Sequence, residues 1–170
     1  MLALAELDAR ISTARLELTP LRRDHAEEMF SILSDVSLYE HTRGVPPASV
    51  SELHARYTYL ESRRSPDGTE AWLNWVLVEI ATGMSIGYVQ VTVTSQHADI
   101  AWVVGTLWQR RGFATEAANA VVAWLRCAGV RAVRARIHPM HSASQRVAAN
   151  AELSLTHETI AGECVWVRRI

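Results

Sequence analysis

The stretch DIAWVVGTLWQRRGFATE, residues 99–116, joins an apolar run to a helical pattern through a glycine-bearing loop. The run DIAWVV is typical of a buried strand, and apolar side chains recur at helical spacing after Gly112. A helix that begins directly after such a loop leaves its first-turn N–H groups unpaired, beside the positive end of the helix dipole. Helix starts of this kind bind anions, phosphate groups above all. The stretch therefore predicts an anion-binding loop at a strand-to-helix junction.

The side chains of the loop suit this interpretation. Gly112 permits a close backbone approach or an unusual dihedral angle, and Ala114 is too small to obstruct a ligand. Thr115 can add a hydroxyl donor, while Arg110 and Arg111 add positive charge that suits a pyrophosphate. Taken alone, a glycine beside two arginines is equally consistent with an ordinary solvent-exposed helix start. The choice between this and an anion-binding loop depends on the rest of the sequence.

Strand and helix patterns alternate around this junction. Strands are expected at 15–21, 72–80, 85–93, 98–104, 130–137, 154–160 and 164–170, and helices at 24–33, 49–60, 113–128 and 141–151. The predicted order is β-α-α-β-β-β-α-β-α-β-β, an α/β fold in which helices pack on a mixed sheet. The three strands within 72–104 should form an antiparallel meander, and strand 130–137, reached across a helix, should run parallel to 98–104.

Capping residues support three of the helix boundaries. Asp24 is expected to cap the first helix, and Ser49 with Glu52 forms the pattern of a capping box before the second. Gly129 is a natural stop for the helix that follows the loop.

The composition excludes several classes of protein. The 170 residues suit a single domain over 1–170, and 49% apolar with 21% charged residues is a globular balance. A formal net charge of −1 argues against binding to nucleic acid or to an anionic membrane. All 17 basic residues are arginine, so a Walker-type phosphate loop, which requires lysine, is excluded.

The remaining composition points to the cytoplasm. The opening segment MLALAELDAR carries acidic residues and no long apolar stretch, so it is not expected to act as a signal peptide. No window reaches the roughly 18 apolar residues of a membrane span. Cys127 and Cys164 are isolated, which argues against a disulfide framework or a metal knuckle. His138 and His141 have the spacing of metal ligands, but no Cys or acid lies nearby, so no metal site is expected.

Three segments resemble the GNAT family of N-acetyltransferases. Residues 109–114, QRRGFA, match the family's acyl-coenzyme A signature Q/R-x-x-G-x-G/A. Residues 13–30, TARLELTPLRRDHAEEMF, look like the opening of the RimJ/RimL-like branch, which acetylates N-termini of ribosomal proteins. Residues 141–148, HSASQRVA, resemble that branch's motif N-x-x-S-x-R-V-A/L. The resemblance covers nearly the whole chain and implies a GNAT-like acyltransferase fold.

The resemblance also implies a donor site for acetyl-coenzyme A. In this fold the fourth and fifth strands splay apart, and the thioester arm lies between them. The implied contacts are with Trp102, Val103, Val104, Gln109, Arg110, Arg111, Gly112, Phe113, Ala114, Thr115, His141, Ser144 and Arg146. Two positions depart from the family pattern. His141 replaces the usual Asn, and Glu152 replaces a Gly that ends the helix. No tyrosine lies in 140–170 to serve as a general acid.

Two residues are candidates for catalysis. Asp99 lies in the central strand, and its carboxylate could take a proton from an incoming ammonium if burial raised its pKa. A solvated acid at the strand edge is the alternative. Ser144 could hydrogen-bond the departing thiolate, or be an ordinary serine in the first turn of a helix. Because neither cysteine lies near the motifs, direct attack by the amine is expected, without a covalent enzyme intermediate.

The expected function is transfer of acetyl from acetyl-coenzyme A to a primary amine. The alternative is a non-catalytic module that binds acyl-coenzyme A on the same fold; a nucleotide-binding switch is disfavoured by the missing lysine. Peptide N-terminus, amino acid, polyamine and aminoglycoside remain open as acceptors, because fold does not fix substrate. Tyr39 and His41 lie in a loop that often closes over the acceptor in this family, although either could simply pack at the surface. The aromatic residues expected mainly in the core, with one or two of them lining an acceptor groove, are Trp72, Trp75, Tyr88, Trp102 and Trp108. The protein could be a monomer or a homodimer, and no nucleic acid or membrane partner is expected.

Overall fold

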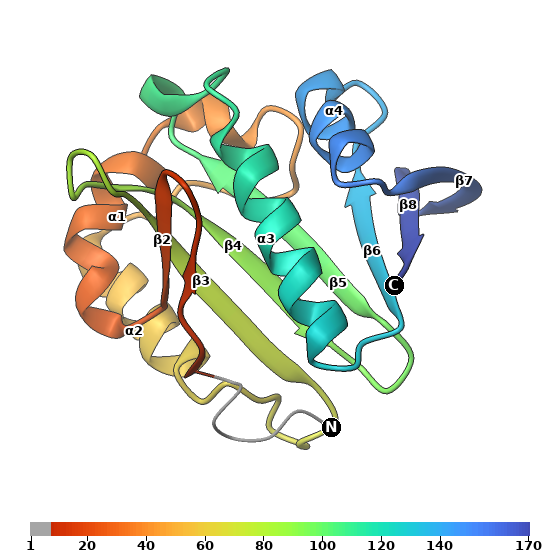
Figure 1. Cartoon of the computed structure of the whole chain (residues 1–170). Coiled ribbons are helices and arrows are strands. Elements are labelled where there is room, and N and C mark those ends of the chain that lie inside the picture. The colour runs from red at the N-terminus through yellow and green to blue at the C-terminus, as the bar shows by residue number, and fades with distance from the viewer. Residues whose placement is uncertain (1–7) are drawn as a thin grey trace.

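The computed structural model describes residues 8–170, which form one eight-stranded sheet between two layers of helices (Figure 1). The strands are β1 (Ile11–Ser12), β2 (Leu16–Pro20), β3 (Ala71–Glu79), β4 (Ser85–Val93), β5 (Ala98–Val104), β6 (Ala132–Ile137), β7 (Ser154–Ile160) and β8 (Glu163–Arg169). The α-helices are α1 (Ala26–Leu33), α2 (Val50–Leu60), α3 (Phe113–Cys127) and α4 (Ser142–Asn150). Short 3-10 helices are η2 (Arg23–His25), η3 (Val36–Tyr39) and η4 (Thr106–Trp108).

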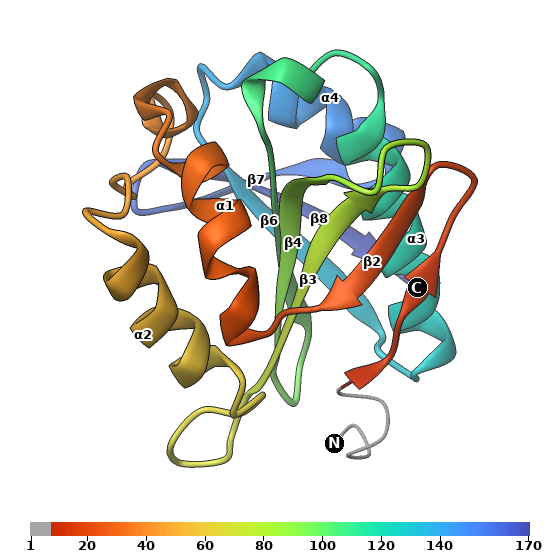
Figure 2. The same ribbon diagram turned by 90° about the vertical axis from the view of Figure 1, so that its left-hand side faces the viewer.

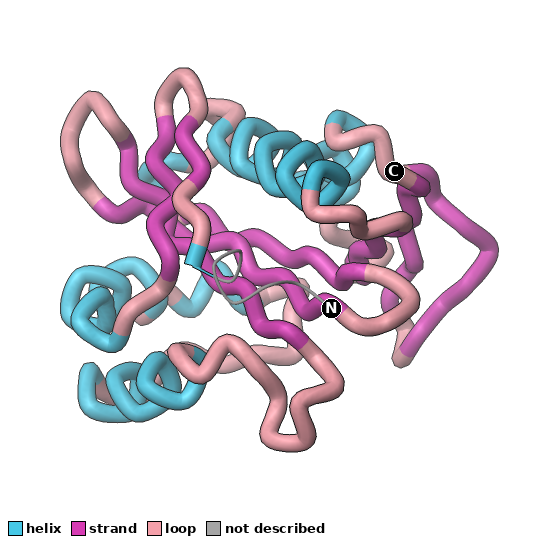
Figure 3. Tube along the Cα trace, turned by 60° about the horizontal axis from the view of Figure 1, so that its bottom comes forward, coloured by secondary structure: helices cyan, strands magenta, loops and turns pink. Residues whose placement is uncertain are grey.

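The predicted order of elements and the mixed α/β class are confirmed. Strands follow the order β1-β2-β3-β4-β5-β6-β8-β7, and β2 to β5 form an antiparallel meander. After α3 the chain returns as β6, which pairs with β5 in parallel, as expected. The two-residue β1 was not predicted, because so short a strand has no periodicity to detect. Figure 3 shows helices above and below the strands.

Each face of the sheet has its own apolar core. Figure 2 shows α1 and α2 on one face and α3 on the other. Leu125 and Ile100 are buried in the core under α3, whereas Met29 and Leu53 are buried in the core under α1 and α2. Each such side chain contributes about 1.5–3 kcal/mol by its burial. Within β5, Ile100 and Val104 belong to the core under α3, and Val103 packs against the other core, so the strand contacts both.

Strands β5 and β6 diverge soon after they meet. Their pairs are Ala98 with Val133 and Asp99 with Arg134, and no further pair joins them in the described part of the chain. From Ile100 to Val104, β5 stays paired with β4 on its other edge. The backbone groups of β5 that point away from β4 are therefore available to a ligand along this stretch.

One of the three predicted caps is wrong, and one is modified. Asp24 lies inside η2, where its carboxylate accepts a bond from Arg23 Nε at 3.2 Å, and α1 begins only after His25. Ser49 caps α2 by accepting from the Glu52 N–H at 3.1 Å, but the Glu52 carboxylate accepts from Ala48 N–H at 2.7 Å. The reciprocal half of the capping box is thus displaced by one residue.

The end of α3 agrees with the prediction. Gly129 has a φ of 81°, and its N–H bonds to the Arg126 carbonyl at 3.1 Å, while Val130 N–H bonds to Leu125 O at 3.0 Å. A left-handed glycine with this pair of bonds ends the helix after Cys127. The prediction for the opening segment falls mainly on residues 1–7, which lie outside the described residues. Within 8–170, no helix has both the length and the apolar character needed to cross a membrane.

Candidate active site

A single open groove of about 1410 Å³ brings most of the predicted site residues together. It begins at the loop before α3, follows β5 where β6 has diverged, and reaches the wall formed by α2 and the residues after η3. The part beside α3 and α4 is called the donor half here, and the part beside α2 and η3 the acceptor half. Tyr39 and His41 line the acceptor half, as their loop position suggested.

The start of α3 has the form of an anion site. Gly112 occupies the N-cap with a φ of 84°, and no side chain in the described residues caps this helix. The first-turn N–H groups therefore have no intrahelical partner. Gly112, Ala114 and Thr115 all line the groove. Arg110 also has a left-handed backbone, with a φ of 61°, and its exposed side chain lines the groove beside these amides.

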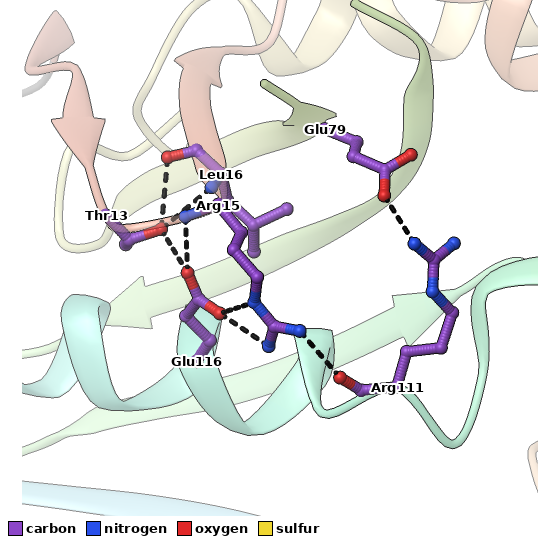
Figure 4. A network of polar contacts seen from close by, with 6 residues as sticks. All are labelled: Thr13, Arg15, Leu16, Glu79, Arg111 and Glu116. Atoms are coloured by element: carbon purple, nitrogen blue, oxygen red, sulfur yellow. Dashed lines mark hydrogen bonds and ion pairs between the residues drawn. The ribbon is translucent and has the colours of Figure 1, made fainter. Parts of the chain in front are cut away.

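A polar network behind the loop holds it in place (Figure 4). Glu116, in the first turn of α3, accepts bonds from Thr13 Oγ1 at 2.7 Å and from Arg15 N and Nε at 2.9 and 2.7 Å. Arg15 Nη1 donates to the Arg111 carbonyl at 2.9 Å. Burial raises the pKa of Glu116, but the hydrogen bonds from Thr13 and Arg15 and the charge of Arg15 outweigh it and hold that pKa below its ordinary value. The loop is thus tied to the segment that leads into β2.

The Arg111 side chain points away from the groove, which corrects its predicted role in binding the pyrophosphate. Its guanidinium points to β3, where Nη2 donates to Glu79 Oε1 at 2.7 Å (Figure 4). Glu79 is only 5% exposed, so this ion pair neutralises an otherwise costly buried carboxylate. Arg111 is not among the residues that line the groove, and with Arg15 it covers the ring of Phe113. The Phe113 side chain is buried, leaving its backbone N–H as the group that can meet a ligand.

Trp102, Val103 and Val104 line the groove where β5 has lost contact with β6. Gln109 closes the end of this edge, because its Nε2 donates to the Val104 carbonyl at 3.0 Å. Gln109 therefore supports the turn from β5 into the loop, in addition to lining the groove.

The surroundings of Asp99 do not suit a proton acceptor, which corrects its predicted role. Its carboxylate is held by Arg134, with Nε to Oδ1 at 2.6 Å and Nη2 to Oδ2 at 2.8 Å. His97 Nε2 lies 3.4 Å from Oδ2. Burial raises the pKa of Asp99, but the hydrogen bonds and charge of Arg134, with His97, bring that pKa below its ordinary value. The carboxylate is a weak base that bridges β5 and β6 at the point where they diverge.

The start of α4 lines the donor half from the other side. Ser144 and Arg146 both line the groove, and the Ser144 hydroxyl has no hydrogen-bond partner within residues 8–170. His141 occupies the N-cap without capping the helix through its side chain. Since His141 and Ser144 are three residues apart at a helix start, their side chains face the same side. This arrangement leaves the Ser144 hydroxyl free to donate to a ligand.

Three histidines from distant segments meet at the mouth of the groove. The His41 ring stacks on His138 with centroids 5.7 Å apart and meets the His141 ring edge-on at 5.0 Å. Burial, together with the charges of His41 and His138, lowers the pKa of His141, while Glu40 opposes that shift. Among residues 8–170, no group of three His, Cys, Asp or Glu side chains is arranged to hold a metal ion. The cluster instead joins the loop after η3 to the loop after β6.

The sequence-based prediction missed most of the acceptor half. Asn74, Tyr88 and Gln90 lie on its floor, and Arg56 and Tyr57 belong to its α2 wall. No site role was predicted for Tyr57, whereas Tyr88 is one of the five aromatic residues of which one or two were expected to line an acceptor groove. The alternation of β3 and β4 places polar residues on a largely buried sheet face, and this was the available signal.

Comparisons with known proteins agree with this geometry. Residues 15–154 match the family model described as acetyltransferase (GNAT) domain. A search of curated protein sequences finds no match. Among solved structures, RimJ from Mycobacterium smegmatis, in complex with a coenzyme A disulfide, is 16% identical with a TM-score of 0.80; the alignment covers 96% of this chain and 88% of that one.

Two further structures share the fold over nearly their whole length. RimL, the ribosomal L7/L12 alpha-N-protein acetyltransferase in complex with coenzyme A, is 15% identical with a TM-score of 0.79, covering 95% of this chain and 98% of that one. The microcin C7 self-immunity acetyltransferase MccE, in complex with acetyl-coenzyme A and AMP, is 14% identical with a TM-score of 0.78, covering 93% and 94%. Identities this low show a common fold. The family match over residues 15–154, on a chain with this sheet and this helix start, shows that the protein belongs to the GNAT family of acetyltransferases.

Proposed function

We propose that this acetyltransferase moves the acetyl group of acetyl-coenzyme A to the primary amine of a peptide N-terminus or a small molecule. The observation that carries the proposal is the single groove in which the uncapped start of α3 adjoins the free edge of β5. The first feature suits a diphosphate, and the second suits an amide-containing arm. RimJ, RimL and MccE, which share the fold, were all solved with coenzyme A or its derivatives, and this supports the choice of donor.

The chain offers suitable groups for each part of acetyl-coenzyme A. The amides of Phe113, Ala114 and Thr115 and the guanidinium of Arg110 would hold the diphosphate. The backbone of β5 from Trp102 to Val104 would pair with the arm. Arg146 at α4 adds a second exposed cation on the donor half. The RimJ/RimL-like branch, suggested by the sequence motifs, favours a peptide N-terminus as acceptor.

The reaction requires an unprotonated amine. Its nitrogen lone pair attacks the thioester carbonyl carbon, the C–N bond forms, and the C–S bond breaks with its electron pair leaving on sulfur. The proton that the nitrogen loses as the amide forms goes to the departing thiolate or to solvent. The free Ser144 hydroxyl would donate to the departing thiolate. An α-amino group, with an ordinary pKa of about 7.7–8.0, is partly neutral near pH 7 and needs only a modest proton acceptor.

His141 is the proton acceptor that we assign in place of Asp99. Burial lowers the pKa of His141, so its imidazole is neutral at pH 7, and it lines the groove on the same side of α4 as Ser144. We expect His141→Gln to reduce kcat/KM most near neutral pH, where the imidazole is unprotonated while much of the amine is still protonated. Asp99→Asn should leave the shape of the pH profile unchanged, because Arg134 already holds that carboxylate as an anion. A profile altered by Asp99→Asn and not by His141→Gln would reverse the assignment.

The decisive experiment for the proposed function is an acceptor screen. Purified protein, acetyl-coenzyme A and a panel of peptides, amino acids, polyamines and aminoglycosides are incubated, free thiol is followed, and products are weighed by mass spectrometry. Thiol release with a product heavier by one acetyl group supports the proposal. Tight binding of acetyl-coenzyme A without thiol release for any amine would favour the non-catalytic binding module.

The setting of the reaction is also part of the proposal. Cys127 and Cys164 are both free thiols, which suits the reducing cytoplasm. We propose that the protein acts there as a monomer or homodimer, with acetyl-coenzyme A and an amine as its partners and without nucleic acid.

A further inference from the structure

Arg56 is an unusual cation on the acceptor half of the groove. It projects from α2, is exposed, lines the groove, and forms no ion pair with any carboxylate in residues 8–170. Glu52, one helical turn earlier, would be its natural partner, but that carboxylate accepts from Ala48 N–H instead. The start of α3, which suits the donor's diphosphate, lies at the opposite end of the groove. Arg56 is therefore left without a partner in the proposed donor complex.

Three tyrosines line the same groove as Arg56 and lie within range of its charge. The charge of Arg56 acts on Tyr39, Tyr57 and Tyr88, opposing the rise that burial causes in the pKa of each. The Tyr39 hydroxyl already has a hydrogen-bond partner, because it donates to the Leu33 carbonyl at 2.9 Å. A tyrosine is protonated at neutral pH, and burial raises the pKa of Tyr57 and Tyr88 further, so both hydroxyls remain hydrogen-bond donors. The site thus presents a cation and neutral donors together.

Tyr57 supplies an independent observation. Its residue is only 4% exposed, yet its hydroxyl has no hydrogen-bond partner among the residues that the structure describes. A buried hydroxyl without a partner costs free energy, so natural structures rarely keep one without a reason. Tyr57 also lines the groove next to Arg56 on α2. A ligand that accepts a hydrogen bond at this place would satisfy the hydroxyl.

Two of the carboxylates that line the groove are held by other side chains. Asp99 pairs with Arg134, and Glu70 accepts from Trp72 Nε1 at 3.0 Å. Glu40 and Glu163 line this groove and also a smaller adjoining pocket of about 280 Å³ beside His41 and His138. None of the carboxylates that line the groove forms an ion pair with Arg56 within residues 8–170, so its charge remains available to a ligand.

We propose that Arg56, Tyr57 and Tyr88 form a subsite for an acidic group, carboxylate or phosphate, carried by the amine acceptor. The inference rests on the proposed function, since it names the substrate class of the same groove. A carboxylate or phosphate oxygen accepts from the Arg56 guanidinium and from the tyrosine hydroxyls, a charge-assisted set of bonds. The acceptor class is an acidic amine, such as a peptide with an acidic residue close to its free N-terminus. Polyamines and aminoglycosides are disfavoured, because Arg56 would repel them.

Matched peptides test the subsite. The peptides are tetrapeptides with a free N-terminus, made in matched pairs. One pair compares Asp with Asn, the other compares phosphoserine with serine, and each pair is made with the varied residue at position one, two or three. Their binding is measured by calorimetry with saturating coenzyme A, and their turnover by thiol release with acetyl-coenzyme A. At one or more positions we expect the acidic peptide to bind at least tenfold more tightly than its neutral partner. A preference confined to phosphoserine assigns the subsite to phosphate, and one shared by Asp assigns it to carboxylate.

Single substitutions distinguish a loss of acidic-peptide recognition from a loss of folding stability. Arg56→Gln should reduce the acidic preference to less than threefold and leave the neutral peptide unchanged. Tyr57→Phe should also weaken the acidic peptide, yet its thermal midpoint should equal or exceed that of the parent, because it removes an unpartnered buried hydroxyl. A purely structural tyrosine would not combine these effects. Arg126→Gln, at an exposed position on α3 away from the groove, is the matched control and should keep the full preference.

Two results would overturn the subsite. One is equal binding of acidic and neutral peptides at all three positions by the parent protein. The other is a preference that survives unchanged in Arg56→Gln. Selective binding of acidic peptides without any acetyl transfer would instead support the subsite and refute the proposed reaction, so the two failures are distinguishable.

Discussion

Replacing Gly87 with alanine tests how closely β4 must approach β5 beside the groove. Gly87 pairs with Val104, and an ideal Cβ at this position would lie 2.1 Å from the Val103 carbonyl oxygen and 2.9 Å from Val104 Cα. Cβ atoms essentially never come within 3.0 Å of another heavy atom in this way, so the strands must separate by about 0.9 Å. The clashing atoms belong to the backbone and cannot rotate aside.

The expected cost follows from this overlap. Overpacking in a core typically costs about 1–3 kcal/mol, and a backbone clash belongs at the upper end. For a protein of this length each kcal/mol lowers Tm by about 2–4 °C, so Gly87→Ala should lower it by roughly 5–10 °C. Because Val103 and Val104 line the groove, displacing them should also weaken coenzyme A by more than about tenfold, or 1.4 kcal/mol.

Thermal unfolding followed by circular dichroism and calorimetric titration with coenzyme A measure these two effects. Gly83→Ala is the control, since Gly83 lies in the turn between β3 and β4 with no atom within 4 Å of its ideal Cβ. It should cost only about 1 kcal/mol for its left-handed backbone and leave coenzyme A affinity intact. A Gly87→Ala protein with the Tm and affinity of the parent would refute the close approach of the two strands.

Three further variants test the groove. Gly112→Asp should weaken coenzyme A by more than about tenfold, because a carboxylate would occupy the anion site. Arg111→Ala should weaken it less, because that side chain acts only indirectly, by holding the loop through Glu79. Calorimetric titration of both variants compares them, and the reverse ranking would contradict the loop assignment. Ser144→Ala should lower kcat while leaving acetyl-coenzyme A affinity nearly intact, because the Ser144 hydroxyl donates to negative charge that develops on sulfur during the reaction. Steady-state kinetics measure both quantities, and an equal loss of affinity would count against this role. For His141 the folded pKa lies below the ordinary value of 6.5, so its contribution to stability is present above pH 6.5 and is lost as pH falls below it. Between pH 7 and 5 the parent should therefore lose more free energy of unfolding in urea than His141→Gln, and parallel losses would argue against the lowered pKa.

The fold was predictable because its signals are local. The apolar alternation of β3, β4 and β5 and the helical spacing of α3 each lie within one segment, and connection rules then fix β6 parallel to β5. The error at Asp24 is also local, since an acidic residue can cap a helix or lie in the 3-10 turn before it. Choosing between them depends on how the chain enters from β2, which no pattern in residues 24–33 records.

The candidate site was predictable in its donor half and much less so in its acceptor half. The loop before α3 is one continuous segment, so its motif could be read directly. The pKa of Asp99, in contrast, depends on Arg134, which parallel pairing of β5 and β6 brings beside it. Arg56, Tyr57 and Tyr88 come from a helix and a strand far apart in the chain. The helical and strand patterns indicate burial for the two tyrosines and exposure for Arg56, and only the tertiary arrangement shows that all three line a groove.

The two adjacent arginines before α3 lie on opposite sides of the loop and have different roles, which their sequence positions do not reveal. Arg111 turns to Glu79 and gives its carbonyl to Arg15, so it holds the loop from the face away from the groove. Arg15 is fixed in turn by Glu116 in the same helix start. Arg110, with its left-handed backbone, is left on the groove side beside the free amides. Because the supporting contacts exist before any ligand arrives, binding does not have to order this loop, and the interaction with an anion is not offset by that entropy cost.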